Sequence, residues 1–342
     1  MRKEGDFMRE KAMIRFAAGL CALLLLLLPA GCGKGEETPA ERWTRKEYIL
    51  PANWDPGPIQ SCAGGTLSVV GYHLTGDEKI CLFTLNEGGG YTEKRELPEM
   101  ERLRSPRWEG STFYGLKDIE GERTFVRYDE EGQLLESRPT GGILPDEPEF
   151  KPVEAVRTPD GTLFWMSYSC LAIVPPEGEA STLRPAWHTE FDRLFLSPDG
   201  GVGVWVRVER GWGVVRIGKR SDGSWLRDGI AYVPEDPPQA GIEVEPLGFD
   251  AEGRFLWAQG NGIGAVCWDE EGPKRMWFLD YDEEGLDAAK YAVSLLPDRR
   301  TLVFSRQELK DPRLEGESDA EYRARTGGAR WRTRFLVLTP AS

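Results

Sequence analysis

Histidine is nearly absent from this sequence, which has only His73 and His188 in 342 residues. Metal sites and general acid–base catalysis commonly use histidine, and these two lie in separate parts of the chain. The sequence also contains neither a GxSxG nucleophile elbow nor a P-loop. We therefore expect no catalytic residue, no metal site and no cofactor, and we interpret both histidines as surface or hydrogen-bonded residues.

Cysteine and positive charge are also scarce. The six cysteines show no CxxC spacing and are too few for a disulfide scaffold of this length. Cys62 and Cys81 could form one bridge in an oxidising compartment, with buried free thiols as the alternative. The chain has 43 Lys and Arg against 57 Asp and Glu, a formal net charge of −14. Such an acidic protein repels phosphate backbones, so we expect no nucleic-acid partner.

One long apolar run stands near the start of the chain, at residues 16–30, with six consecutive leucines at 23–28. It is shorter than the ~20 residues that a membrane-spanning helix needs. Basic residues precede it at Arg2, Lys3, Arg9, Lys11 and Arg15. A basic segment followed by a short apolar core is typical of a signal peptide, and we assign this role to residues 1–31.

The apolar run ends in Ala30-Gly31-Cys32, and a polar segment, GKGEE, follows at 33–37. This ending resembles a bacterial lipoprotein signal, in which a small residue before the cysteine permits lipidation of the thiol and cleavage in front of it. The resemblance implies lipid attachment at Cys32, the bacterial cytoplasmic membrane as a partner and an extracytoplasmic location. Plain secretion, with an ordinary thiol at Cys32, is the alternative. We expect residues 32–46 to form a flexible tether.

The rest of the chain is rich in turn formers, with 40 Gly and 24 Pro, which disfavours a helical bundle. A turn with Gly or Asp repeatedly precedes an apolar strand. The clearest copies are TPDG at 158–161, SPDG at 197–200, DAEG at 250–253 and PDRR at 297–300. Equivalent turn positions are 65, 110, 161, 200, 253 and 299, about 47 residues apart on average. A drifting strand repeat of this length is typical of β-propeller blades.

Each repeat can be divided into four short strands, which predicts an all-β domain over residues 47–342. Six repeats fit between Pro58 and Thr339, and the last one lacks its outer strand. A spare strand, at residues 48–54, precedes the first repeat. Because propellers often close by pairing strands from the two ends of the chain, we predict six blades, with seven as the alternative. Trp165, Trp205 and Trp257 recur in the second strand of their repeats and are predicted to pack between blades.

The SPDG and TPDG turns, with the single Trp268-Asp269 pair, look like those of TolB-type and WD-repeat-like propellers. The resemblance implies a binding or protein-interaction module on the cell surface. One alternative is an extracellular enzyme that acts on glycans or peptides, with a carboxylate site in the central channel. Another is a structural partner within a membrane complex.

The segment 307–332 interrupts the last repeat and is rich in arginine. Ser318 followed by Glu321 forms a capping-box pattern, which predicts a short helix. Arginine is favoured at interfaces, so we predict that this insertion contacts a protein or an anionic surface polymer. The predicted contact residues are Ser318, Glu321, Tyr322, Arg323 and Arg325. Acidic residues between the repeats could form a rim beside it: Asp146, Glu147, Glu149, Glu235, Asp236, Glu243, Glu245, Asp280, Asp282, Glu283 and Glu284.

Overall fold

The computed structural model describes residues 42–341, apart from 75–79, 101–102, 145–149, 185–189, 210, 222, 234–243, 270–271, 287–290 and 328–329. Residues from Trp43 onward form one compact unit. The predicted signal peptide, Cys32 and tether residues 32–41 lie outside the described residues. Within the described part of the chain, no helix is both long and apolar enough to cross a membrane.

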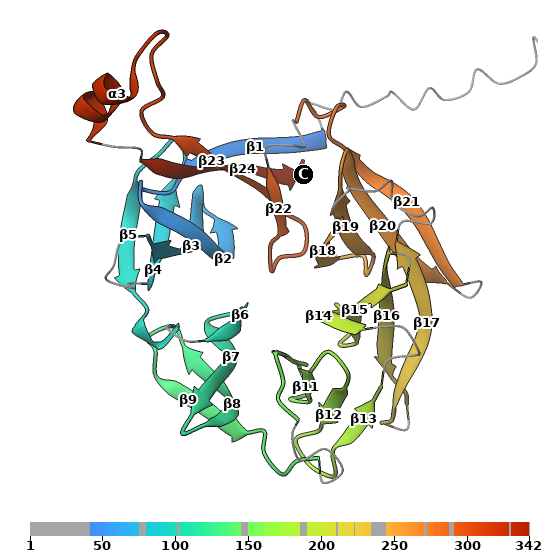
Figure 1. The fold of residues 1–342 in the computed structure, drawn as a ribbon. Helices are drawn as coiled ribbons and strands as arrows, with labels where there is room; N and C mark the ends of the chain where they lie inside the picture. Colours follow the sequence, from blue (N-terminus) through green and yellow to red (C-terminus); the bar gives the residue numbers. More distant parts are fainter. Residues whose placement is uncertain are drawn as a thin grey trace, which may run out of the picture. The chain divides into compact units, whose positions relative to one another are not determined.

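Six antiparallel sheets of four strands each stand around a central axis, as Figure 1 shows. The chain is therefore an all-β, six-bladed propeller, as predicted. Blade 1 holds β2 (Trp54–Ala63), β3 (Thr66–His73), β4 (Ile80–Asn86) and β5 (Tyr91–Glu96), and the 3-10 helix η1 (Pro98–Met100) follows it. Blade 2 holds β6 (Arg104–Glu109), β7 (Thr112–Ile119), β8 (Glu122–Asp129) and β9 (Leu134–Pro139). Blade 3 holds β10 (Glu154–Arg157), β11 (Leu163–Met166), β12 (Leu171–Val174) and β13 (Ser181–Leu183).

The second half of the ring repeats this order. Blade 4 holds β14 (Glu190–Leu196), β15 (Val202–Val208), β16 (Gly211–Lys219) and β17 (Trp225–Val233). Blade 5 holds β18 (Val244–Phe249), β19 (Phe255–Gln259), β20 (Gly262–Asp269) and β21 (Gly272–Asp280). Blade 6 holds β22 (Ala292–Leu295), β23 (Leu302–Leu309) and β24 (Trp331–Pro340) from the end of the chain, with β1 (Trp43–Ile49) from its start as the fourth strand.

The ring is closed by β1, which pairs antiparallel with β24 from Trp43 opposite Pro340 to Ile49 opposite Arg334. This pairing confirms that a strand from the start of the chain completes the last blade. The strand begins at Trp43, so residues 43–46 of the predicted tether belong to it, while Trp54 opens blade 1. The charges between Trp43 and Tyr48 hid the strand in the sequence, because its two buried aromatic residues are separated by a solvated stretch.

Aromatic side chains fill the spaces between blades. The ring of Trp205 in blade 4 stacks on that of Phe255 in blade 5, with centroids 5.7 Å apart. Trp165, Trp205 and Trp257 are all buried, which confirms their predicted packing role. A buried aromatic side chain contributes roughly 3 kcal/mol relative to exposure. Packing between neighbouring blades therefore holds the inner strands in place around the axis.

The turns between the first and second strands of the blades have the geometry that their sequences predict. Gly161, Gly200 and Gly253 adopt φ values of 85°, 82° and 79°, in the left-handed region. The preceding aspartates accept hydrogen bonds from the backbone: Oδ1 of Asp160 from Thr162 N–H and Oδ1 of Asp199 from Gly201 N–H, both at 3.1 Å. We call the turns that connect the first, innermost strand of a blade to its second strand the inner turns.

The described cysteines are free thiols: Cys62, Cys81, Cys170 and Cys267. The Cys62–Cys81 bridge is therefore absent, and the alternative of free thiols holds. Cys81 and Cys170 are buried.

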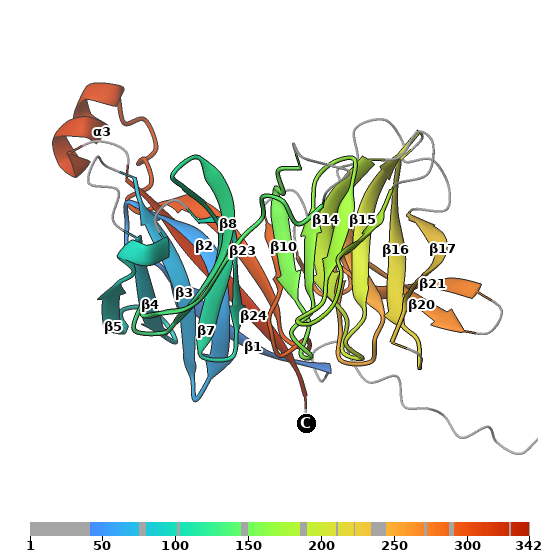
Figure 2. The same ribbon diagram turned by 90° about the horizontal axis from the view of Figure 1, so that it is seen from below.

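The insertion forms α3 (Asp319–Thr326), which confirms the predicted helix. Both hydrogen bonds of the capping box between Ser318 and Glu321 are present, and Gly327 ends the helix in the left-handed conformation. Figure 2 shows α3 at the outer edge of one face of the ring and the C-terminus on the opposite face.

Candidate functional site

A channel of about 920 Å³ runs through the centre of the ring. The inner strand of every blade contributes to its wall: β2, β6, β10, β14, β18 and β22. Residues that are up to about 240 positions apart in sequence, such as Pro58 and Arg299, therefore line one cavity. The channel is the cavity to which every blade contributes residues, and we take it as the candidate site.

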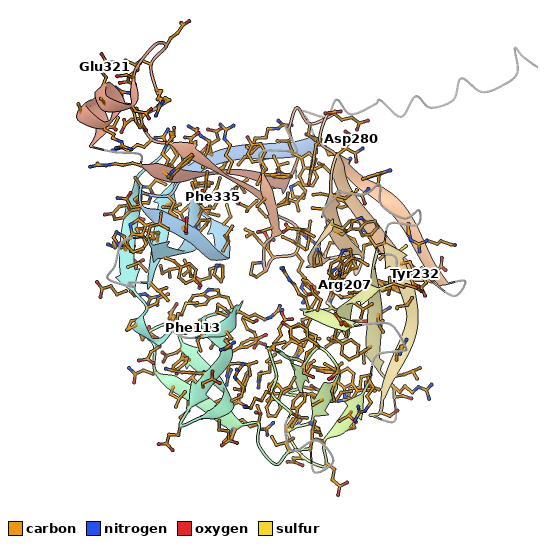
Figure 3. The ribbon with its side chains drawn as sticks, viewed as in Figure 1. Phe113, Arg207, Tyr232, Asp280, Glu321 and Phe335 are labelled. Carbon is orange, nitrogen blue, oxygen red and sulfur yellow. The ribbon has the colours of Figure 1, made fainter. Side chains whose placement is uncertain are left out.

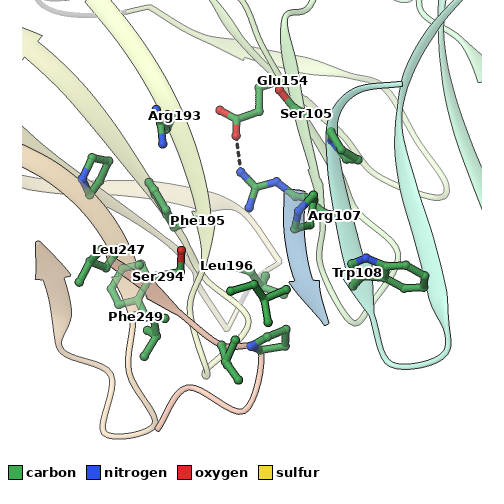
Figure 4. A pocket seen from close by; sticks show the side chains of 18 of the residues that line it. Ser105, Arg107, Trp108, Glu154, Arg193, Phe195, Leu196, Leu247, Phe249 and Ser294 are labelled. Carbon is green, nitrogen blue, oxygen red and sulfur yellow. Dashed lines mark hydrogen bonds and ion pairs between the residues drawn. The ribbon is translucent and has the colours of Figure 1, made fainter. Parts of the chain in front are cut away.

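An ion pair joins three blades in the channel wall. Arg107 of β6 donates a hydrogen bond to Glu154 of β10, as Figure 4 shows, and a second one to the carbonyl oxygen of Leu194 of β14 at 2.6 Å. The backbone N–H of Leu194 donates to the other carboxylate oxygen of Glu154 at 2.8 Å. Both oxygens of Glu154 are thus occupied, so the pair is a fixed part of the wall.

The surroundings keep Arg107 charged. Burial acts to lower its pKa, but the negative charge of Glu154 and the hydrogen bond between them outweigh burial, so the pKa is raised. Glu154 is only 6% exposed. Removing either partner would leave the other as a buried charge without compensation, which is strongly unfavourable.

Aromatic side chains line the channel on two sides. Figure 4 shows Trp108 of blade 2 across the cavity from Phe195 of blade 4 and Phe249 of blade 5, which lie beside Leu247. The guanidinium carbon of Arg107 lies 5.9 Å from the centroid of the Phe195 ring. Apolar surface therefore adjoins a charged wall, an arrangement suited to a small polar molecule with apolar faces.

The polar lining carries both signs of charge. Asp192 and Arg193 approach each other at 3.8 Å, and Glu109 lies 3.8 Å from Arg157. Glu245 is exposed in the wall and makes no hydrogen bond or ion pair within the described residues. No group of three or more His, Cys, Asp or Glu side chains that could hold a metal ion occurs in the described part of the chain.

The five predicted contact residues lie together on or beside α3, far from the channel; Figure 3 shows Glu321 at the periphery of the molecule. Ser318 and Glu321 bind each other through the capping box, at 2.9 Å between Ser318 N and Glu321 Oε2. Arg323 is exposed, and its side chain makes no hydrogen bond or ion pair to any other described residue.

Tyr322 and Arg325 hold the insertion together. The ring of Tyr322 is 4% exposed and lies between the guanidinium groups of Arg313 and Arg325, at 5.2 and 5.6 Å. Arg325 also binds both carboxylate oxygens of Glu317, at 2.7 and 2.9 Å. Of the five predicted residues, Arg323 is thus the one whose charge is directed to solvent.

The acidic rim is only partly described, because Asp146, Glu147, Glu149, Glu235, Asp236 and Glu243 lie outside the described residues, as does His188. Glu284 is buried and paired with Arg45 of β1 at 2.5 Å, so it stabilises blade 6. Asp280 caps its own turn by accepting the N–H of Asp282 at 2.9 Å. His73 packs edge-on against Trp54, with centroids 4.8 Å apart.

Sequence reasoning missed the channel residues Arg107, Glu154, Arg193 and Arg299. Their proximity depends on the ring, and no short motif contains them. Arg299 alone left a signal in the sequence, because PDRR stands where the other clear turns have glycine.

No protein-family model and no curated protein matches the chain. Among solved structures, it is similar to a periplasmic gluconolactonase from Pseudomonas aeruginosa (16% identity, TM-score 0.39, covering 65% of this chain and 69% of that one). It is also similar to a gluconolactonase from Xanthomonas campestris (15% identity, TM-score 0.42, covering 85% of this chain and 97% of that one). A third similar structure is a PQQ-bound aldose sugar dehydrogenase from Streptomyces coelicolor (16% identity, TM-score 0.40, covering 86% of this chain and 98% of that one).

Identities this low describe the fold alone. None of the three has the name of a TolB-type or WD-repeat protein. The six-bladed architecture of this chain is shown by its own sheet order.

Proposed function

We propose that the central channel is the functional site and that it binds a small molecule of the carbohydrate class. The observation that carries this proposal is the convergence of all six inner strands on one cavity that is lined by both aromatic and polar side chains. Its volume of about 920 Å³ is within the range of small-molecule sites.

The lining matches the two kinds of surface that a sugar presents. The C–H faces of a sugar ring are apolar and pack on aromatic side chains such as Trp108 and Phe195, which are half-buried in the lining. Its hydroxyl groups need donors and acceptors, which Ser294, Asp192 and Arg193 provide around the same cavity. A purely apolar ligand would leave these groups without partners.

A catalytic role is the second candidate. The names of the similar structures are those of enzymes, which is nearer to the enzyme alternative than to an interaction module. The observation in this chain that favours it is Glu245, a carboxylate in the channel wall with no partner among the described residues. Glu245 would act as a general base that activates water against a bound sugar derivative. Glu245→Gln would then abolish turnover and leave binding intact.

The location proposed for this site is outside the cytoplasmic membrane. The signal-peptide pattern and the Ala-Gly-Cys ending support export followed by lipid attachment at Cys32. A propeller held in this way would meet its ligand as it diffuses past the cell surface.

A channel-filling variant tests the proposal. Ser294→Trp adds a large ring to an exposed position on β22 in the channel, and Ser137→Trp adds the same ring to exposed strand β9 as a matched control. Calorimetric titration with neutral mono- and disaccharides should show saturable binding of at least one sugar to the wild type. We expect Ser294→Trp to weaken it at least tenfold and Ser137→Trp to leave it unchanged. Equal affinity in all three proteins, or no saturable binding to the wild type, would contradict the proposal.

A further inference from the structure

The six inner turns differ in one residue at equivalent positions. Each turn places one residue in the left-handed region, with φ between 59° and 85°. Five of these residues are glycine and the sixth is arginine: Gly65, Gly110, Gly161, Gly200, Gly253 and Arg299. The ring therefore contains its own comparison, in which blade 6 alone has a side chain at this point.

The conformation of Arg299 is unfavourable for a residue with a Cβ. At φ 59° the Cβ is crowded by the following carbonyl group, a strain that glycine avoids. Asp298 binds the N–H groups of Arg300 and Thr301, both at 2.9 Å, and so fixes the turn around the strained residue. Strain that persists where a better residue is available motivates the hypothesis of a functional role.

Arg299 belongs to the lining of the channel and stands in the turn between β22 and β23. Arg299 lines the cavity, and its carbonyl oxygen accepts the N–H of Ala251, from the inner turn of blade 5, at 3.0 Å. Its guanidinium also senses the charge of Asp199, which belongs to the inner turn of blade 4. Asp199 and Arg299 belong to blades 4 and 6, which stand on either side of blade 5.

This guanidinium is only partly satisfied. Its Nη1 atom is buried and has no hydrogen-bond partner among the described residues. Burial lowers the pKa of Arg299, and the charge of Asp199 opposes that shift only in part. Asp199 is itself bound to Arg216 and to the N–H of Gly201. Arg299 as a whole is half-buried, and a half-buried cation with an unused donor favours an incoming anion.

The other arginines of the channel are less available. Arg107 is bonded to Glu154 and to the Leu194 carbonyl oxygen, and Arg193 lies beside Asp192. Arg107 also has an unpaired donor, its Nε atom, but Arg107 and Arg193 already have carboxylate partners. Arg299 is the guanidinium of the described lining that forms no ion pair with the described residues.

We propose that Arg299 is the anion-recognising residue of the channel, and that the ligand carries a carboxylate or phosphate group that pairs with its guanidinium. A planar guanidinium can give two parallel hydrogen bonds to either group. This inference rests on the proposed function and adds the charge of the ligand to it.

The test replaces Arg299 with glycine, the residue at the equivalent position of the other five inner turns. Arg299→Gly restores the residue of the other five turns, so the variant should melt at the same temperature as the wild type or higher. Arg300→Ala removes the same charge from the exposed neighbour in the same turn and is the matched control. Arg299→Asn, which tolerates the left-handed region, is a second variant in case the glycine variant folds poorly.

The probes share one sugar ring and differ in charge. D-glucuronate carries a carboxylate, D-glucose 6-phosphate carries a phosphate and D-glucose is neutral, while acetate and inorganic phosphate are minimal anions. By calorimetric titration at low ionic strength, we expect at least one anion to bind the wild type and Arg300→Ala saturably. Arg299→Gly should weaken that binding at least tenfold and leave any binding of neutral sugar unchanged. The preferred anion tells carboxylate from phosphate.

Two results would overturn the inference: no saturable anion binding to the wild type, or the same anion affinity in Arg299→Gly. The proposed function fails separately. If a neutral sugar binds and Ser294→Trp blocks it, the channel remains a binding site even though Arg299 recognises no anion.

Discussion

Arg107 and Glu154 belong to different blades, yet they form one ion pair in the channel wall, and Leu194 of a third blade bonds to both. The pair therefore links the shape of the channel to the packing of the ring. A change in either residue should alter stability and ligand binding together.

Glu154→Gln should be strongly destabilising, because it leaves the Arg107 guanidinium buried without a counter-charge. We expect a loss of about 3 kcal/mol and a fall in melting temperature of roughly 5–10 °C. Scanning calorimetry measures both. The double variant Arg107→Met/Glu154→Leu should recover part of the loss, since it removes both charges. A double variant that melts below Glu154→Gln would show that the charges themselves are needed.

Deletion of β1 should open the ring. A mature chain that begins at Leu50 lacks the strand that pairs with β24, so β24 becomes an unprotected edge. We expect aggregation or a cooperative fall in melting temperature, measured by light scattering and circular dichroism. A chain that begins at Arg42 keeps β1 and is the control. If both chains melt alike, closure by β1 does not stabilise the ring.

The interaction role of the insertion stays a prediction. Replacing residues 318–325 with a Gly-Ser linker should leave the melting temperature of the propeller nearly unchanged, because no strand is altered. We expect the linker variant to lose the partner that the wild type retains in a crosslinking pull-down from detergent extract. Arg323→Ala, which keeps Tyr322 and its packing, should weaken the same capture. Equal recovery by the linker variant would mean that the insertion binds no partner.

The insertion should also show an acid transition of its own. The hydrogen bond from Arg325 lowers the pKa of Glu317 from 4.5 to about 2. A carboxyl whose pKa is lowered on folding stabilises the folded state above its unfolded pKa, and this contribution is lost as the pH falls through the folded pKa. Amide exchange should find α3 protected at pH 4 and unprotected near pH 2. In Arg325→Ala, Glu317 loses the ion pair that lowers its pKa, so protection of α3 should already be weaker at pH 7 and should change less between pH 5 and 2.

Lipid attachment is tested at Cys32. Stable anchoring takes more than one acyl chain, at ~0.8 kcal/mol per buried CH₂ group. Cys32→Ala should move the protein from the membrane fraction to a soluble or uncleaved form, as judged by fractionation and immunoblotting. Wild-type protein that is soluble in the culture medium would rule out the lipid anchor.

The fold could be read from the sequence because local chemistry repeats in every blade. Turns such as 197–200 require glycine after aspartate, and each marks the passage from an inner strand to a buried one. The helix α3 was equally predictable, since its capping box is encoded within four residues.

The channel was not predictable in the same way. Arg107 and Glu154 are separated by 47 residues, and their contact depends on the angle between neighbouring blades, which no local pattern records. The strand β1 was misplaced by a few residues for a similar reason: its outer face is charged, so its alternation is weak. Arg299 could have been singled out from the sequence, because it stands where the equivalent turns have glycine.

The pairing of β1 with β24 also determines when the ring can close during synthesis. Trp43 is among the first residues of the domain to be synthesised, and its neighbour Pro340 is among the last. At ~5–20 residues per second, tens of seconds separate the two. Through that interval the first strand of the domain lacks the partner beside which it finally lies, and its backbone groups are open to other chains. A chain that stops before Trp331 never receives that partner. The ring can therefore close only after β24 has been synthesised, and a product that ends before β24 cannot bury its first strand.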